Sequence, residues 1–141
     1  MVLLFDRYNL PENIYEVVFA TEQQAIVAQI LIDHMKHNNS AFTKTEMSYF
    51  ATRLHEGEMV TTINQGTLAG KKVKISYNKR QFYDRILTPM KSMGMIDYDL
   101  YKKTYTLSDK FKQSLMRIGM LWTEELTKPS FTLKTEGASH S

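Results

Sequence analysis

The chain of 141 residues contains no cysteine. This absence excludes disulfide bonds, thiolate catalysis and cysteine-ligated zinc or iron–sulfur centres together. No apolar run approaches the roughly 18 residues that a membrane-spanning helix needs. The apolar run at residues 2–5 is too short for the core of a signal peptide, and Asp6 follows it directly. We therefore expect a cytoplasmic protein with no membrane partner.

The signatures of common enzymes are also missing. Residues 66–72 contain glycines and lysines but lack the spacing and the Ser/Thr of a phosphate-binding loop. No glycine-flanked serine nucleophile is present. His34 and His37 have a spacing that metal ligands can use, but the neighbouring Asp33 does not share a helix face with both of them. We expect no enzyme activity, no catalytic residue, no metal site, no cofactor and no identifiable small-molecule ligand.

Charge is distributed unevenly, although the formal net charge is only +3. Residues 1–70 hold four basic and eight acidic side chains, whereas residues 71–112 hold eleven basic and four acidic ones. With 43% hydrophobic residues, the chain is expected to fold as one domain with a sizeable core. A run of lysines is often only a solvated face. A basic cluster on an architecture that reads DNA would instead indicate phosphate contacts.

Two capping boxes mark the starts of the first clear helices. Thr21 with Gln24 opens a helix to about His37, and apolar residues surround most of its circumference, as in a central buried helix. Thr43 with Glu46 opens a second helix, which is expected to end near Gly57. Residues 1–20 precede these helices and are interpreted as an N-terminal arm that completes the core or an interface.

A third helix followed by a hairpin is predicted for residues 76–107. Ser76 is the expected N-cap, and the inward stripe consists of Phe82, Ile86, Met90 and Met93. Pro89 is expected to kink this helix, and Gly94 to end it with a positive φ. Residues 95–98 and 104–107 are β-type runs joined by a polar turn.

The run FYDRILTPMKSMGMIDYDLYKKTYTLSDKFK resembles the recognition helix, the wing and the start of the final helix of winged helix-turn-helix transcription factors, particularly small archaeal and archaeal-virus regulators. Together with the upstream helices, the resemblance covers roughly the middle two thirds of the chain. It implies an α+β, mainly α fold: a winged helix-turn-helix at residues 21–107, with the arm at 1–20 and an extra C-terminal helix at 108–127. A polar tail follows at 128–141.

The chain departs from this pattern between its second and third helices. A simple helix-turn-helix has only a few connecting residues, but here residues 56–75 intervene. We interpret them as an inserted hairpin or ordered loop, because β-type runs at 60–63 and 72–75 flank a glycine-bearing segment. Its lysines at positions 71, 72 and 74 are expected near the DNA-facing surface.

The candidate DNA-contacting residues lie on the outer face of the third helix and at the tip of the wing. They are Tyr77, Asn78, Lys79, Arg80, Gln81, Asp84, Arg85, Thr88, Lys91, Tyr101, Lys102 and Lys103. Arg and Gln have the forked geometry that reads guanine and adenine edges in the major groove, and wing lysines suit backbone or minor-groove contacts. The alternative is an ordinary solvated face and a turn kept soluble by lysines.

The expected function is sequence-specific binding of double-stranded DNA as a transcription regulator. The alternatives are a winged-helix module for protein–protein interaction or assembly, and a plasmid or viral replication initiator. A homodimer is expected because one winged helix covers little duplex.

The expected dimer contacts lie on the last helix. They are Met116, Met120, Leu121 and Trp122. The main stripe of that helix consists of Phe111, Leu115, Ile118, Trp122 and Leu126, and one stripe can pack on the domain while another remains available for a partner. The alternative is that the arm folds back over this helix within one chain.

Overall fold

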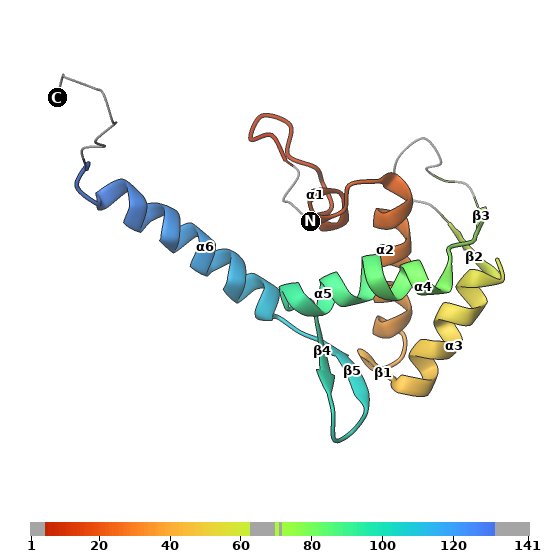
Figure 1. Cartoon of the computed structure of the whole chain (residues 1–141). Helices are drawn as coiled ribbons and strands as arrows, with labels where there is room; N and C mark the ends of the chain where they lie inside the picture. The colour runs from red at the N-terminus through yellow and green to blue at the C-terminus, as the bar shows by residue number, and fades with distance from the viewer. Residues whose placement is uncertain (1–4, 63–69, 71, 132–141) are drawn as a thin grey trace, which may run out of the picture.

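The computed structural model describes residues 5–62, 70 and 72–131, and most of the apolar run at residues 2–5 lies outside this part (Figure 1). The helices are α1 (Ile14–Val18), α2 (Glu22–Lys36), α3 (Lys44–His55), α4 (Lys79–Phe82), α5 (Thr88–Met93) and α6 (Lys110–Thr127), with a π-helical turn η2 (Tyr83–Leu87) between α4 and α5. The strands are β1 (Ala41–Thr43), β2 (Met59–Thr62), β3 (Lys72–Ile75), β4 (Ile96–Asp99) and β5 (Thr104–Leu107). The fold is α+β and mainly helical with small antiparallel sheets, which confirms the predicted class.

Two sheets tie distant parts of the chain together. The first has the strand order β1-β5-β4, with β5 antiparallel to both neighbours and Thr104 opposite both Thr43 and Asp99. Strand β1 could not be predicted from the sequence, because its three residues are too few to show an alternating pattern. The second sheet pairs β2 with β3 and confirms a hairpin within residues 56–75. Its residues 63–69 and 71 lie outside the described part of the chain.

The capping boxes place the helix starts as expected. The Gln24 N–H donates to the Thr21 hydroxyl over 3.1 Å. At α3 the exchange is reciprocal, because the Glu46 N–H donates to the Thr43 hydroxyl and the Thr43 N–H donates to the Glu46 carboxylate. The bond from the Thr43 N–H is the main cause of a lowered pKa at Glu46. The stabilisation that the ionised Glu46 gives the folded state is therefore complete at pH values above the pKa of this group in the unfolded chain. It is lost as the pH falls through the lower pKa of Glu46 in the folded state.

The α4, η2 and α5 segments follow one another without a break and form helix 79–93, whose start differs from the prediction. Ser76 is not its N-cap; Asn78 is, because its side-chain oxygen accepts from the Gln81 N–H over 3.0 Å. The Ser76 hydroxyl instead lies 3.4 Å from the His55 carbonyl, to which it donates. The irregularity expected at Pro89 takes the form of η2, where the Thr88 N–H reaches back to the Tyr83 carbonyl. Proline has no N–H to continue the α-helical ladder, so a widened turn precedes it.

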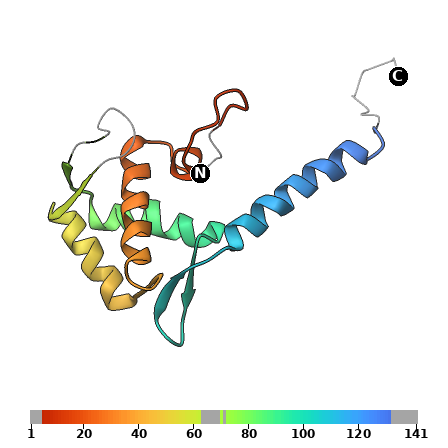
Figure 2. The same cartoon turned by 180° about the vertical axis from the view of Figure 1, so that it is seen from behind.

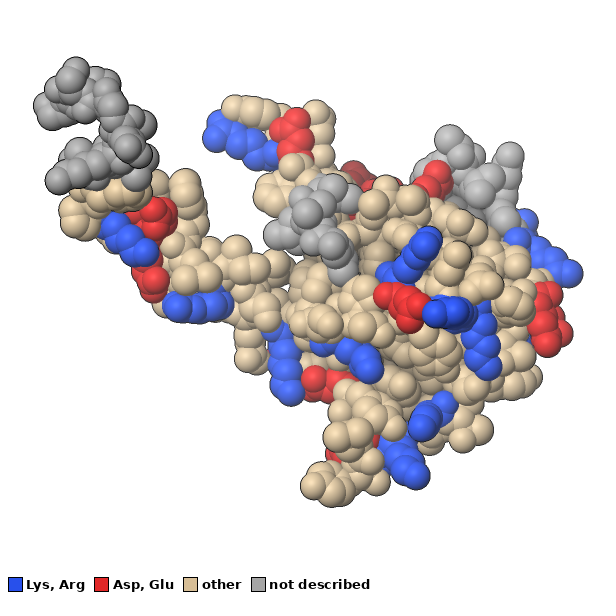
Figure 3. All heavy atoms as spheres, viewed as in Figure 1, with Lys and Arg blue, Asp and Glu red and all other residues tan. Residues whose placement is uncertain are grey.

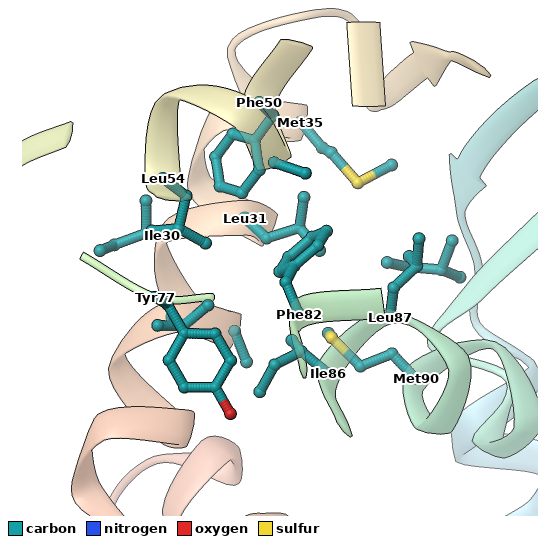
Figure 4. Packing of buried hydrophobic residues seen from close by; sticks show 14 of the residues in the cluster. Ile30, Leu31, Met35, Phe50, Leu54, Tyr77, Phe82, Ile86, Leu87 and Met90 are labelled. Atoms are coloured by element: carbon teal, nitrogen blue, oxygen red, sulfur yellow. The ribbon is translucent and has the colours of Figure 1, made fainter. Parts of the chain in front are cut away.

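The core lies between α2, α3 and helix 79–93. Phe82 is fully buried, and its ring centroid lies 5.6 Å from that of Phe50 (Figure 4). Around them the fully buried side chains include Leu31, Met35, Met47, Leu54, Ile86, Leu87 and Met90. Val18 and Phe19 are also buried, so the end of the segment 1–20 belongs to this core. The core therefore fixes one face of helix 79–93 and leaves the other outside.

The last helix contradicts one expectation. Its main apolar stripe does not pack on the domain, because no residue of α6 is buried. Only the first turn, at Phe111, packs partly against the core, and the rest of α6 projects away from the body in both views (Figures 1 and 2). None of the described helices combines the length and apolar character needed to cross a membrane.

Gly94 joins α5 to the β4–β5 hairpin and is a test of this geometry. Its φ is +86°, and an added Cβ would lie 2.9 Å from backbone atoms of Lys110 and Phe111. We expect Gly94→Ala to lower the free energy of unfolding by about 1–3 kcal/mol, because both the conformation and the contact oppose a side chain. Gly70→Ala is the control, with a φ of +81° and no atom of the described residues within 4 Å of an added Cβ. Urea denaturation checks this, and equal effects of the two changes would contradict the close contact.

Candidate nucleic-acid interface

The outer face of helix 79–93 is polar and basic. Phe82, Ile86 and Met90 are buried on the inner side. The exposed residues on the outer side are Arg80, Gln81, Asp84, Arg85 and Thr88. Figure 3 shows basic side chains gathered over this helix and over the β4–β5 hairpin on the same face of the molecule. Basic side chains of these two elements are therefore visible on one face of the molecule.

Asp84, the one acidic side chain of this face, has a partner. Its carboxylate lies 3.8 Å from the Arg80 guanidinium, one turn away on the same helix. The Arg80 side chain is 91% exposed, and exposed pairs of this kind contribute little to stability. The pair can therefore open at small cost when a phosphate or base edge approaches Arg80. In the protein without DNA, this ion pair restricts the conformations of the Arg80 side chain.

Lys79 holds the start of helix 79–93 against α3. Its ammonium group donates to the Thr52 hydroxyl over 2.8 Å and to the Ser48 hydroxyl over 3.3 Å. Its backbone N–H donates to Nδ1 of His55 over 2.9 Å. The Lys79 side chain was expected to contact DNA, but the structure directs it back to the protein. It acts here as a positioning residue for the helix that carries Arg80.

Tyr77 does not belong to the interface. Its side chain is only 6% exposed and lies at the edge of the core (Figure 4), and its backbone N–H donates to the Leu54 carbonyl. The prediction that Tyr77 contacts DNA is therefore wrong. Tyr77 was included because it lies close in sequence to the start of helix 79–93. The segment before this helix alternates between inward and outward side chains, however, and Tyr77 points inward while Ser76 and Asn78 are exposed.

Lys91 connects helix 79–93 to the hairpin. Its ammonium group lies 5.7 Å from the ring centroid of Tyr98 on β4 and 5.8 Å from that of Tyr105 on β5. Such cation–π contacts favour one position of a flexible side chain. The two rings are themselves 4.5 Å apart, so they form one platform beneath the cation. Lys91 thus places a positive charge at the junction between helix and hairpin.

The tip of the β4–β5 hairpin is a structured turn. The Asp99 carboxylate accepts from the backbone N–H groups of Tyr101 and Lys102 at 2.9 and 3.0 Å. The bond from the Lys102 N–H is the main cause of a lowered pKa at Asp99, so the turn favours the ionised form of this carboxyl group. Tyr101 is 99% exposed, and Lys102 and Lys103 are exposed beside it. An ordered turn therefore presents two cations and one aromatic ring to the solvent.

Lys44 is a further basic residue near the hairpin tip, and it was not among the candidate contact residues. Its backbone N–H donates to the Lys103 carbonyl over 2.9 Å, and its side chain is exposed. The pairing of Thr43 with Thr104 brings it there. Recognition of strand β1 in the sequence would have predicted this position of Lys44, but β1 has only three residues. Of the lysines of the inserted hairpin, Lys72 and Lys74 are exposed, while position 71 lies outside the described residues.

No metal centre is evident in residues 5–62, 70 and 72–131, because they contain no group of three or more His, Asp or Glu side chains that could hold an ion. His34 and His37 instead each direct Nδ1 to a backbone carbonyl of their own helix, Ile30 and Asp33 respectively. Comparison of the chain with protein-family models, with curated proteins and with solved structures gave no match.

Asn78 was expected to contact DNA, but its side-chain oxygen caps helix 79–93. We expect Asn78→Ala to lower the free energy of unfolding by about 1 kcal/mol through loss of the cap. Asn78→Ser is the matched variant, since serine caps helices comparably. Both stability, by urea denaturation, and duplex affinity should be recovered in Asn78→Ser if the residue acts through the cap. Affinity lost equally in both variants would instead identify a direct contact through the amide.

Proposed function

We propose that this chain is a winged helix-turn-helix protein that binds double-stranded DNA sequence-specifically and regulates transcription. In this proposal α2, α3 and helix 79–93 are the three helices, and the β4–β5 hairpin is the wing. The pairing of β1 with β5 supports it, because a strand between the first two helices then anchors the wing. The β2–β3 hairpin is an insertion between α3 and helix 79–93.

The observation that carries the proposal is the common orientation of two basic elements (Figure 3). Arg80, Gln81 and Arg85 are exposed on the outer face of helix 79–93, and Lys102 and Lys103 are exposed at the tip of the hairpin. An α-helix fits the major groove of B-DNA, where arginine and glutamine distinguish base pairs by paired hydrogen bonds. A neighbouring basic loop then reaches the phosphate backbone and fixes the orientation of the helix.

The two sets of side chains have different roles. Lys102, Lys103, Lys44 and Lys91 neutralise phosphates, which supplies affinity for any duplex. Arg80, Gln81 and Arg85 read base edges, which supplies preference among duplexes. Lys79 and Asn78 act indirectly by setting the position of the helix. The protein performs no chemistry in this role, and it acts in the compartment of the DNA, which we take to be the cytoplasm.

Selection from a randomised duplex library tests this proposal. The wild-type chain at about 50 mM salt is expected to retain duplex DNA, and sequencing of the retained fraction should show one enriched motif. The winged-helix assembly module predicts no retention of any duplex at this salt concentration. Retention without enrichment would leave a non-specific DNA-binding protein and contradict the sequence-specific part of the proposal.

A further inference from the structure

Two exposed apolar side chains occupy the tip of the β4–β5 hairpin. Tyr101 is 99% exposed and Leu100 is 76% exposed, and the hairpin that carries them projects from the body of the molecule (Figures 1 and 2). Single exposed apolar residues are common on soluble proteins. A hairpin tip, however, is usually built from Gly, Asn, Asp, Pro or Ser, because these residues fit the backbone of a turn. The turn itself therefore does not explain the presence of Leu100 and Tyr101.

The turn at residues 100–103 is held in one conformation by hydrogen bonds from the surrounding chain. The Asp99 carboxylate accepts from two of its backbone N–H groups, at 2.9 and 3.0 Å. The Thr104 hydroxyl donates to one of its carbonyl groups over 2.9 Å, and the Lys44 N–H donates to another over the same distance. A preorganised tip of this kind loses little conformational entropy when it enters a binding site.

Lys103 adopts a backbone conformation that lysine rarely takes. Its φ is +50°, in the left-handed region, where glycine and asparagine are the usual residues. Non-glycine residues held in this region cluster at functional sites. A glycine at this position would relieve the strain, but it would also remove a cation from the tip. Lys102 and Lys103 thus place two positive charges in the same turn as Leu100 and Tyr101.

An apolar tip flanked by cations matches the chemistry of the minor groove of DNA. Phosphates line this groove and attract lysine, and architectural proteins insert leucine and similar side chains between its base pairs. An inserted side chain partly unstacks one base step and kinks the duplex by about 20–90°. A neighbouring aromatic ring can then stack on the base that has lost its stacking partner. A stable protein–protein contact would need a much larger surface than this tip offers.

We propose that the tip of the β4–β5 hairpin enters the minor groove and inserts Leu100 into one base step, with Tyr101 stacked on the base that this insertion exposes. Lys102 and Lys103 contact the neighbouring phosphates. This inference rests on the proposed binding of duplex DNA and adds a kink in the bound duplex to it. Leu100 was not among the candidate contact residues.

The kink gives the protein a sequence preference that does not depend on hydrogen bonds to bases. The pyrimidine–purine steps TA and CA/TG unstack most easily, so insertion is most favourable at them. Major and minor grooves alternate along one face of the duplex every half turn, which is about five base pairs. The selected motif should therefore contain a TA or CA/TG step about five base pairs from the centre of the bases read by helix 79–93. A motif without such a step would contradict the inserted tip.

Two measurements with the full chain and the selected duplex test this inference. Energy transfer between dyes at the two ends of the duplex reports bending, and 2-aminopurine placed in the flexible step reports unstacking by an increase in its fluorescence. The wild type is expected to give both signals, with a bend of about 20° or more. It should also prefer the flexible step over an AA step by about fivefold or more. Leu100→Ser should lose both signals and this preference, while its salt slope stays unchanged because the lysines remain.

Leu100→Met is the matched control, because methionine also inserts between base pairs and should keep both signals. Circular dichroism verifies that both variants are folded. A wild type that binds the selected duplex without bending it or unstacking a base would overturn the inserted tip and leave the DNA-binding proposal intact. Bending and unstacking that persist in Leu100→Ser would also overturn it. If the wild type bound no duplex at all, both proposals would be wrong.

Discussion

Replacing Phe82 with alanine is expected to lower the free energy of unfolding by about 3–5 kcal/mol. Phe82 is fully buried, and its ring packs at centroid distances of 5.6 Å from Phe50 and 5.5 Å from Tyr83. It is one of the fully buried residues, with Ile86, Leu87 and Met90, that pack helix 79–93 into the core (Figure 4). Small domains have a total stability of about 5–15 kcal/mol, so this loss would bring the chain close to unfolding at room temperature.

Tyr101→Ala is the control for this prediction. It removes an aromatic ring of similar size from the hairpin tip, where the side chain is 99% exposed, and should change the free energy of unfolding by less than about 0.5 kcal/mol. Urea denaturation followed by circular dichroism measures both. A loss below about 1 kcal/mol for Phe82→Ala would show that helix 79–93 does not pack on the core as described.

Replacing Arg80 and Arg85 together with alanine is expected to weaken binding to the selected duplex by about 2–4 kcal/mol and to remove its preference over other sequences. Each arginine that contacts a guanine edge contributes about 1–3 kcal/mol of discrimination. Both side chains are exposed on the outer face of helix 79–93, and Arg80 is held only by an exposed ion pair. The fold should be unaffected, because neither side chain contributes to the core.

The matched variant for this prediction is Lys102→Ala with Lys103→Ala. It removes two charges at the hairpin tip and should weaken binding to selected and random duplexes by the same factor. Fluorescence anisotropy with both kinds of duplex gives the two affinities for each protein. If the arginine pair also weakened all duplexes equally, helix 79–93 would contact only phosphates, and base reading by this helix would be excluded.

Much of the fold follows from local signals in the sequence. The two threonine caps locate the starts of α2 and α3 because both partners of each cap lie within one turn. Gly94 ends α5 for a similarly local reason, the positive φ. The start of helix 79–93 was misplaced because Ser76 and Asn78 are both good caps. The choice between them depends on His55. Its Nδ1 accepts a hydrogen bond from the Lys79 N–H, and its backbone carbonyl accepts one from the Ser76 hydroxyl. That contact spans more than twenty residues of sequence.

The interface was predicted less completely than the fold. Helical periodicity identified the outer face with Arg80, Gln81 and Arg85, and they are exposed. Helical periodicity does not indicate which polar side chains of the outer face form hydrogen bonds with a neighbouring helix. The hydrogen bond from the Lys79 ammonium group to the Thr52 hydroxyl was therefore not predicted. For α6, amphipathicity predicted that its stripe is covered, but it carries no information on whether the cover is the same chain or another molecule. These differences arise from tertiary contacts that no local pattern records.

The salt dependence of duplex binding tests the central claim most directly, because phosphate contact is the part of the account that every other functional statement needs. The affinity of the wild-type chain for duplex DNA is measured by anisotropy from about 50 to 300 mM salt. For roughly four to six neutralised phosphates, the logarithm of the association constant should fall against the logarithm of salt with a slope of about −3.6 to −5.4. The Lys102→Ala, Lys103→Ala variant should show a slope smaller in magnitude by about 1.8. No measurable binding at the lowest salt concentration, or binding that does not change with salt, would contradict the assignment of helix 79–93 and the β4–β5 hairpin as a DNA-binding surface.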